Sequence, residues 1–192
     1  HNLVVDNFYL TDGGRFESSG DVTVNNLMEW KHNGLMGGTG TTTISPGAAL
    51  TISQNTGGNT FWHLDRDLTI SNGATSTWTE TVAGTVPKFY ISFGAQLVNE
   101  GQFDVIMADP LNAKFVTTDA SATAFDNPGT LTFSAAGGSG SPLFTFDGVA
   151  VNNSGLVEQG DLDLVLLNWG ADWPPEIEGW VNDACSPDPA AP

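Results

Sequence analysis

His63, Asp65 and Asp67 form the sharpest cluster of residues that could do chemistry. They alternate along one predicted strand, so their side chains share one face of it. Carboxylates on such a face can hold Ca²⁺, and with a Lys or Arg as base the site could act on a polysaccharide. Leu64 and Leu68 place the apolar face of the strand on the opposite side. We therefore interpret the three polar residues as a solvent-facing surface and a candidate binding site.

A second candidate is a calcium site towards the C-terminal end. An EF-hand-type loop places oxygen ligands at positions 1, 3, 5 and 12 and a glycine at position 6. With Gly155 as the sixth position, Asn152, Ser154 and Asp161 take positions 3, 5 and 12, whereas Ala150 takes position 1. The missing first carboxylate weakens this site, and the alternative is that the segment only caps the fold. No cofactor is expected apart from this candidate calcium ion.

Other catalytic arrangements are not indicated. His1, His32 and His63 are the only histidines, and no nucleophile motif accompanies them. The 22 acidic residues could supply a glycosidase pair, but nothing singles one out. We therefore predict a non-enzymatic protein.

The charge balance excludes some partners. The formal net charge is −17, and only five basic residues are scattered along 192 residues, so no basic patch can form. We therefore expect no binding of nucleic acid and no attraction to an anionic membrane. No apolar run reaches membrane length, so we also expect no membrane insertion. The first residue is His1, and a processed or excised chain of a secreted protein suits the composition.

The elements that would position these residues recur along the whole chain. A glycine turn is followed by a short strand with alternate apolar residues, and the turn glycines lie 27, 26, 28, 28 and 26 residues apart, at Gly20, Gly47, Gly73, Gly101, Gly129 and Gly155. Such a near-constant step indicates a solenoid of stacked coils. We predict an all-β fold, a single parallel β-helix of about seven coils. A sandwich or jelly roll would show shorter strand spacing and no return to one motif.

The repeat predicts four regions. Residues 1–19 form an N-terminal coil or cap, residues 20–160 the solenoid repeats, residues 161–170 a capping helix, and residues 171–192 an extended Pro-rich tail. In-register coils should also stack like side chains, giving ladders of Phe and of Asn about 4.8 Å apart.

The helix is predicted from spacing. Leu162, Val165, Leu166 and Trp169 recur at helical intervals, and Asp161 can cap the helix at its start. The following glycine, Gly170, would end it.

Two resemblances follow from these motifs. The turns Ser71-Asn-Gly-Ala74, Asn127-Pro-Gly-Thr-Leu131 and Asn153-Ser-Gly-Leu-Val157 resemble the β-helical, passenger-like repeats of secreted bacterial surface proteins and adhesins, over residues 13–158. Residues 157–170, with the run Gly160-Asp-Leu-Asp-Leu-Val-Leu-Leu-Asn-Trp-Gly170, look like half of a dockerin-type calcium module. These resemblances imply an extracellular or cell-surface protein.

We therefore expect a secreted structural protein that self-assembles head to tail into an extracellular or cell-surface filament, because a parallel stack has two open ends. The candidate assembly residues lie in the first coil, the helix and the tail: Leu3, Val4, Val5, Leu166, Trp169, Trp173, Trp180 and Cys185. Cys185, the single cysteine, is either a free surface thiol or an intermolecular crosslink.

Two alternatives remain open. The first is an adhesin or carbohydrate-binding module of a larger surface protein, with a surface polysaccharide as partner. Its six tryptophans would form a sugar-stacking platform, although tryptophans more often fill cores. The second is a lyase-like polysaccharide-active enzyme that uses residues 63–67.

Overall fold

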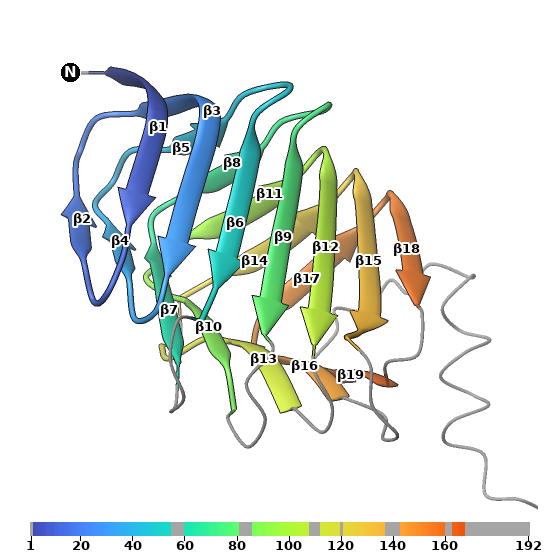
Figure 1. The fold of residues 1–192 in the computed structure, drawn as a ribbon. Coiled ribbons are helices and arrows are strands. Elements are labelled where there is room, and N and C mark those ends of the chain that lie inside the picture. The colour runs from blue at the N-terminus through green and yellow to red at the C-terminus, as the bar shows by residue number, and fades with distance from the viewer. Residues whose placement is uncertain are drawn as a thin grey trace, which may run out of the picture.

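The chain winds into an all-β parallel solenoid whose successive turns stack through strand pairs (Figure 1). The computed structural model describes residues 2–54, 60–80, 86–107, 112–119, 121–136, 143–159 and 163–167. All strand pairings within these residues are parallel. The predicted fold class, a β-solenoid, is confirmed.

The solenoid has three faces. The first face contains β5 (Thr42–Ile44), β8 (Leu68–Ile70), β11 (Gln96–Asn99), β14 (Ala124–Asn127) and β17 (Ala150–Asn153). The second contains β6 (Ala49–Ser53), β9 (Thr75–Glu80), β12 (Gln102–Met107), β15 (Thr130–Ala135) and β18 (Leu156–Gln159). The third contains β2 (Arg15–Glu17), β4 (Leu35–Gly37), β7 (Phe61–Asp65), β10 (Lys88–Ile91), β13 (Asn112–Val116), β16 (Leu143–Asp147) and β19 (Asp163–Leu167).

Two long strands join the first and second faces at the N-terminal end. β3 (Val22–Lys31) pairs with β5 through its first half and with β6 through its second half. β1 (Leu3–Leu10) pairs with β3 along its length, with a register shift between Val5 and Asn7 where the chain turns the corner. The shift absorbs the extra residue of β3 at this corner.

The regular body consists of four turns of three strands, each paired on both sides: β5–β6–β7, β8–β9–β10, β11–β12–β13 and β14–β15–β16. The circuits β1–β2 and β3–β4 precede this body, and β17–β18–β19 follows it. The solenoid therefore has about four regular turns, fewer than the predicted seven coils, with incomplete circuits at its two ends.

The predicted helix over residues 161–170 is wrong in its described part. Residues 163–167 form β19, which pairs in parallel with β16. The edge of β16 offers unpaired backbone groups that a strand can bond and a helix cannot. A short apolar run does not distinguish the two by periodicity alone. The rest of this segment and the tail, residues 171–192, lie outside the described residues.

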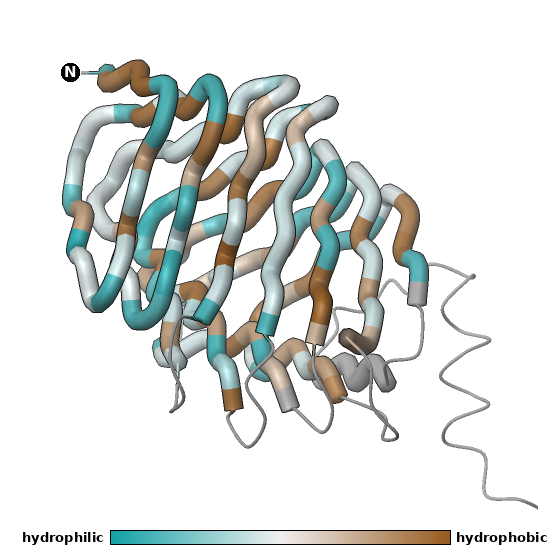
Figure 2. The backbone as a smooth tube through the Cα atoms, in the orientation of Figure 1, coloured by the Kyte–Doolittle hydropathy of each residue, from teal (hydrophilic) through white to brown (hydrophobic). Residues whose placement is uncertain are grey.

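The core is built from ladders of like side chains. Figure 2 shows hydrophobic and more hydrophilic residues alternating along several of the strands. On the third face Trp62, Phe89, Phe115 and Phe146 occupy successive rungs and are almost fully buried. The Phe89 and Phe115 ring centroids are 5.2 Å apart, and those of Phe115 and Phe146 are 5.3 Å apart. The predicted Phe ladder is confirmed, and each buried ring contributes roughly 1.5–3 kcal/mol.

Three of the six tryptophans are core residues. Trp30, Trp62 and Trp78 are fully buried, and the rings of Trp62 and Trp78 meet edge to face at 5.5 Å. They cannot form a sugar-stacking platform. The other three lie outside the described residues.

An asparagine ladder fixes the corner between the first and second faces. Asn99 Nδ2 donates to Asn127 Oδ1 at 2.6 Å, and Asn127 Nδ2 donates to Asn153 Oδ1 at 2.6 Å. Each amide also donates to a backbone carbonyl of the corner, those of Thr130, Leu156 and Gly155 respectively. Two of these carbonyls belong to the first residues of β15 and β18, so the amides tie the ends of the first-face strands to the second face.

We predict that Asn127→Ala lowers the free energy of unfolding by about 1–3 kcal/mol, because it removes both ladder bonds and leaves buried polar atoms unpaired. Asn152→Ala is the matched control. Its side chain is exposed and donates to Asp126, so its loss should cost less than about 1 kcal/mol. Urea unfolding of both variants measures the difference, and equal losses would contradict a stabilising ladder.

Candidate functional site

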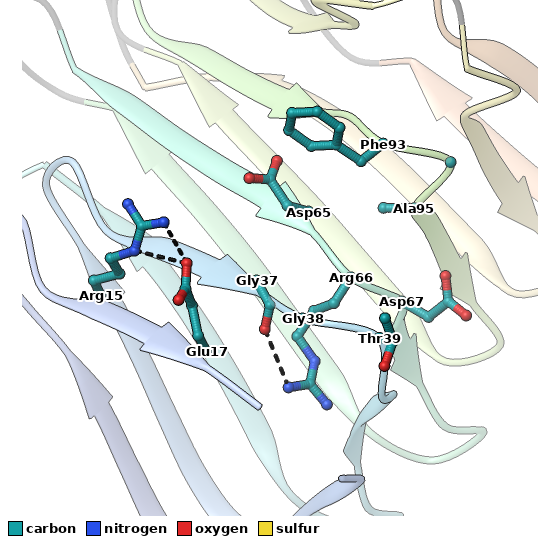
Figure 3. A pocket seen from close by; sticks show the side chains of 11 residues that line it. Arg15, Glu17, Gly37, Gly38, Thr39, Asp65, Arg66, Asp67, Phe93 and Ala95 are labelled. Carbon is teal, nitrogen blue, oxygen red and sulfur yellow. Dashed lines mark hydrogen bonds and ion pairs between the residues drawn. The ribbon is translucent and has the colours of Figure 1, made fainter. Parts of the chain in front are cut away.

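A groove of about 570 Å³ lies near the corner between the third and first faces and includes Asp65 and Asp67 among its lining residues. It is lined by β2, by β4, by the end of β7 and by the turn after β10. Figure 3 shows Arg15 and Glu17 on one side of Gly37, and Asp65 and Phe93 on the other. The groove therefore gathers charged, polar and aromatic groups from several turns.

Gly37 forms the floor of this groove because it has no side chain to fill the space. Glu17, Gly37 and Asp65 occupy successive rungs at one outward-facing position. Two rungs separate the flanking carboxylates, about 9.6 Å of strand spacing. The rung between them carries no side chain, and a hollow results.

The carboxylate of Asp65 borders the hollow, and one of its oxygens lacks a hydrogen bond within the described part of the chain. Its Oδ1 is shielded from solvent and has no hydrogen-bond partner among the described residues. Burial raises the pKa of Asp65 above its usual value, against the opposing charges of His63 and Arg15. This carboxylate is therefore an acceptor without a donor.

His63 lies one outward position away on the same strand. Its ring stacks on Tyr90 with centroids 4.7 Å apart and planes inclined by 18°. Burial lowers the pKa of His63, although the charge of Asp65 acts in the opposite direction. His63 and Tyr90 thus form a flat, half-buried aromatic pair beside the groove.

The structure brings together only part of the predicted 63–67 surface. His63 and Asp65 do face outward from β7, as their alternation predicted. Asp67 lies beyond the end of the strand, where its Oδ1 accepts a hydrogen bond from the Gln96 N–H at 3.0 Å. Among the described residues, no group of three His, Cys, Asp or Glu is arranged to hold a metal ion.

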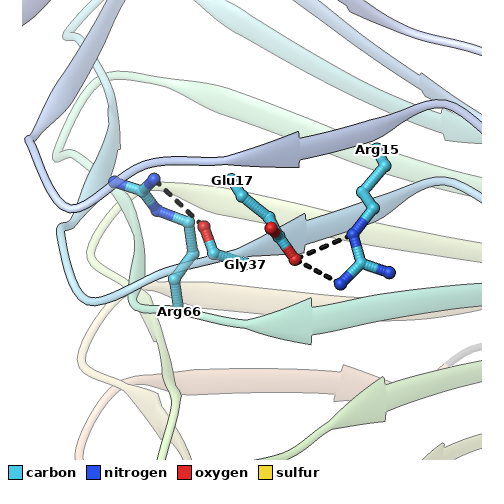
Figure 4. A network of polar contacts seen from close by, with 4 residues as sticks. All are labelled: Arg15, Glu17, Gly37 and Arg66. Carbon is cyan, nitrogen blue, oxygen red and sulfur yellow. Dashed lines mark hydrogen bonds and ion pairs between the residues drawn. The ribbon is translucent and has the colours of Figure 1, made fainter.

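Arg66 is directed into the solenoid. Its guanidinium donates to the carbonyls of Ser18, Gly20 and Gly37 at 3.2, 2.9 and 3.5 Å, and lies 5.3 Å from the Phe16 ring centroid. Burial lowers its pKa, with Asp21 and Asp67 opposing. Figure 4 shows this arginine apart from the surface pair of Arg15 and Glu17. Arg66 lines the groove, but its guanidinium holds two backbone segments together, the turn after β2 and the end of β4, so it is not positioned as a base.

The glycines next to this arginine are required by packing. A Cβ at Gly38 would collide with the Ser18 carbonyl, and one at Gly40 with the Gly20 carbonyl. Gly38 also has a φ of 103°. The glycines at 38 and 40, which follow β4, thus form a tight corner whose backbone approaches the preceding turn too closely for side chains.

Phe93 is the groove residue that the sequence reasoning missed. It is 72 % exposed and has a φ of 57°. The turn containing it is closed by a hydrogen bond from Ala95 N to Ser92 O at 3.1 Å. Its own N–H donates to Asp119 Oδ2 at 2.7 Å, and this bond lowers the pKa of Asp119.

A sequence signal for Phe93 exists. Residues 45–48, 71–74 and 92–95 all read Ser-x-Gly-Ala, and all three turns are closed by the same Ala-to-Ser backbone bond. The second position is Pro46, Asn72 and then Phe93. The aromatic residue is the exception in this sequence pattern. The third turn also lies at a different corner, between the third and first faces, and has a positive φ at its second residue, which the other two turns do not.

The candidate calcium ligands are not arranged as an EF-hand-type loop in the described residues. Residues 150–153 and 156–159 form β17 and β18. Asn152 Nδ2 donates to Asp126 Oδ1 at 2.6 Å, and the Ser154 N–H donates to the Asn127 carbonyl at 3.1 Å. Asp161 lies outside the described residues.

Four of the eight candidate assembly residues lie in the described part of the chain. Leu3 and Val4 are 44 % and 64 % exposed on β1, and Val5 is partly buried against the core. Leu166 lies in β19. The remaining four, Trp169, Trp173, Trp180 and Cys185, lie outside the described residues.

Comparison with known proteins adds no family. No protein-family model, curated protein or solved structure matches the chain. The resemblances to adhesins and to dockerin therefore receive no support, and the β-solenoid fold stands on the strand pairing. In the described part of the chain no helix is long and apolar enough to cross a membrane.

We predict that Asp65→Asn stabilises the fold at pH 7. A carboxyl whose pKa is raised on folding contributes stability below its usual value of 3.8, and that contribution is lost as the pH rises through the folded pKa. The amide of asparagine does not ionise, so the variant does not lose this stability as the pH rises. Urea unfolding should show a higher midpoint for the variant at pH 7 and no gain below about pH 3.8.

The matched control is Asp67→Asn, whose carboxylate is exposed and accepts the Gln96 N–H. It should give no stabilisation at pH 7. A gain for Asp65→Asn that persists below pH 3.8 would show that charge is not its cause.

Proposed function

We propose that this protein is a non-enzymatic structural unit of an extracellular or cell-surface assembly, which associates with copies of itself through the ends of the solenoid. The observation that carries the proposal is the one-sided pairing of β1. Within the described residues β1 pairs only with β3, and exposes the apolar side chains of Leu3 and Val4. An open strand edge of this kind is a template for another strand.

The direction of the backbone hydrogen bonds shows which N–H and C=O groups of β1 do not face β3. The Leu3 N–H donates to the Asp21 carbonyl at 2.8 Å, so Leu3 faces the neighbouring turn. Backbone groups alternate in direction along a strand, and those of Val4 therefore point away from β3. Val4 combines an available N–H and C=O with a side chain that is 64 % exposed.

The matching partner is a second copy placed head to tail. β17, β18 and β19 stand at the opposite ends of the stacks and pair on one side within the described residues. Both ends thus present three faces with the same strand direction. A copy stacked on β1 would continue parallel pairing at a spacing of about 4.8 Å.

Charge favours contact at the ends over contact between the sides. A formal net charge of −17 makes broad lateral association of copies unfavourable. The first circuit is apolar at its core, where the rings of Phe8 and Phe16 meet at 5.1 Å and are only partly buried. End-to-end contact would cover these rings.

We predict that Val4→Pro abolishes assembly and leaves the fold intact. Proline removes an N–H that points to the free edge, and edge positions tolerate it. Light scattering after size exclusion and negative-stain microscopy of the full chain should show oligomers or filaments for the parent and monomers for the variant. Added salt should promote the parent's assembly, because it screens the repulsion between acidic copies.

Val4→Thr is the matched control, since it keeps the N–H and the branched side chain and should still assemble. Thr51→Pro is not suitable, because that strand is paired on both sides. A parent that stays monomeric at high concentration and at all salt concentrations would refute the proposal.

A further inference from the structure

Phe93 is not explained by folding. A large side chain that stays 72 % exposed gains little from burial, and a φ of 57° strains a bulky residue by about 1–3 kcal/mol. Glycine or asparagine adopts this left-handed conformation at lower cost than phenylalanine does. An exposed aromatic that costs stability points to contact with something outside the chain.

Gly37 is not explained by folding either. Its φ is not positive, and the nearest atoms to an added Cβ would be Leu35 Cδ2 at 3.3 Å and Glu17 Cγ at 3.5 Å. Both belong to side chains that can move. Gly38 differs sharply, because its added Cβ would strike the Ser18 backbone. Gly37 is therefore dispensable for the backbone, and its one structural effect is the hollow above it.

Asp65 is the third groove residue that folding does not explain. Its shielded Oδ1 lacks a donor among the described residues, and a buried acceptor left unpaired costs about 1–3 kcal/mol. Across the hollow, Arg15 Nε donates to Glu17 Oε1 at 2.7 Å, and this pair is more than half exposed. The second Asp65 oxygen, Oδ2, is not shielded in this way, so the groove has an accessible acceptor on one wall and an exposed donor and acceptor on the other.

We propose that this groove binds an uncharged polysaccharide, with one sugar ring against Phe93 and a ring hydroxyl donating to Asp65. A sugar ring has a flat apolar side that packs on an aromatic and a rim of hydroxyls that act as donors and acceptors. The groove volume of about 570 Å³ lies within the roughly 300–1,000 Å³ of typical ligand sites.

The charge of the molecule selects among polysaccharides. At −17, acidic polymers such as polyuronates are repelled over the whole surface. A neutral chain meets no such barrier, and the groove is open along the surface, so a polymer could run through it. The proposal is independent of self-assembly, because it uses outward side chains and assembly uses the edge of β1.

The test is affinity electrophoresis and titration calorimetry of the full chain. The probes are neutral polymers (a mixed-linkage β-glucan, a galactomannan and dextran), with polygalacturonate as an acidic probe and chitosan oligomers as a cationic one. We expect binding to at least one neutral polymer and none to polygalacturonate. Val4→Pro should bind equally, which separates this site from the assembly surface.

Two substitutions test the groove without threatening the fold. Gly37→Thr fills the hollow with a residue that strands favour, and Phe93→Asn removes the ring with a residue that tolerates the left-handed conformation. Each should weaken binding about tenfold or more. Neither should lower the thermal midpoint, and Phe93→Asn should raise it.

Tyr9→Asn is the control, because Tyr9 is 58 % exposed on β1 and does not line the groove. It should bind within about twofold of the parent. The proposal fails if no neutral polymer binds or if only chitosan or polygalacturonate binds. It also fails if Gly37→Thr and Phe93→Asn bind as well as Tyr9→Asn.

Discussion

The in-register stacking of parallel strands is the constraint on which the rest of the structure depends. Each residue meets its counterpart in the next turn about 4.8 Å away, so a side chain must be compatible with copies of its own position. Apolar residues and rings satisfy this inside, as Phe89 on Phe115 does. Asparagine satisfies it at a buried corner because each amide is both donor and acceptor. The ladder begins against Ile70, and there Asn99 Oδ1 has no donor among the described residues.

The regular glycines meet this constraint for two different reasons. Gly47 and Gly73 occupy left-handed conformations with φ of 80° and 84°. Gly129 and Gly155 have no such φ, but a Cβ on either would collide with the carbonyl of the glycine one turn away. The first kind serves a turn within one coil, and the second allows coils to approach each other. One spacing in the sequence thus reflects both a local requirement and a stacking requirement.

The sequence could predict features that repeat from coil to coil, and it could not predict features that depend on contacts between unrelated segments. Repetition predicted the solenoid and its Phe and Asn ladders, because stacking turns sequence period into spatial contact. It also predicted that His63 and Asp65 face outward. The strand β19 escaped prediction, since its apolar spacing fits a helix and only the edge of β16 decides for a strand. The groove escaped too, because it joins β2, β4, β7 and the turn after β10, and no local pattern links these segments.

Departures from the ladder are therefore informative in a fold of this kind. Where every outward rung could carry a side chain, Gly37 leaves one bare without a backbone reason. Where a left-handed turn position would favour glycine or asparagine, Phe93 exposes a ring on a strained backbone. Asp65, the outward partner of Gly37, keeps a shielded oxygen unpaired. Stacking alone would favour none of these three, and each costs stability or forgoes it. Their convergence on one groove is best explained by a ligand that packs on Phe93, fills the hollow above Gly37 and hydrogen-bonds the Asp65 carboxylate.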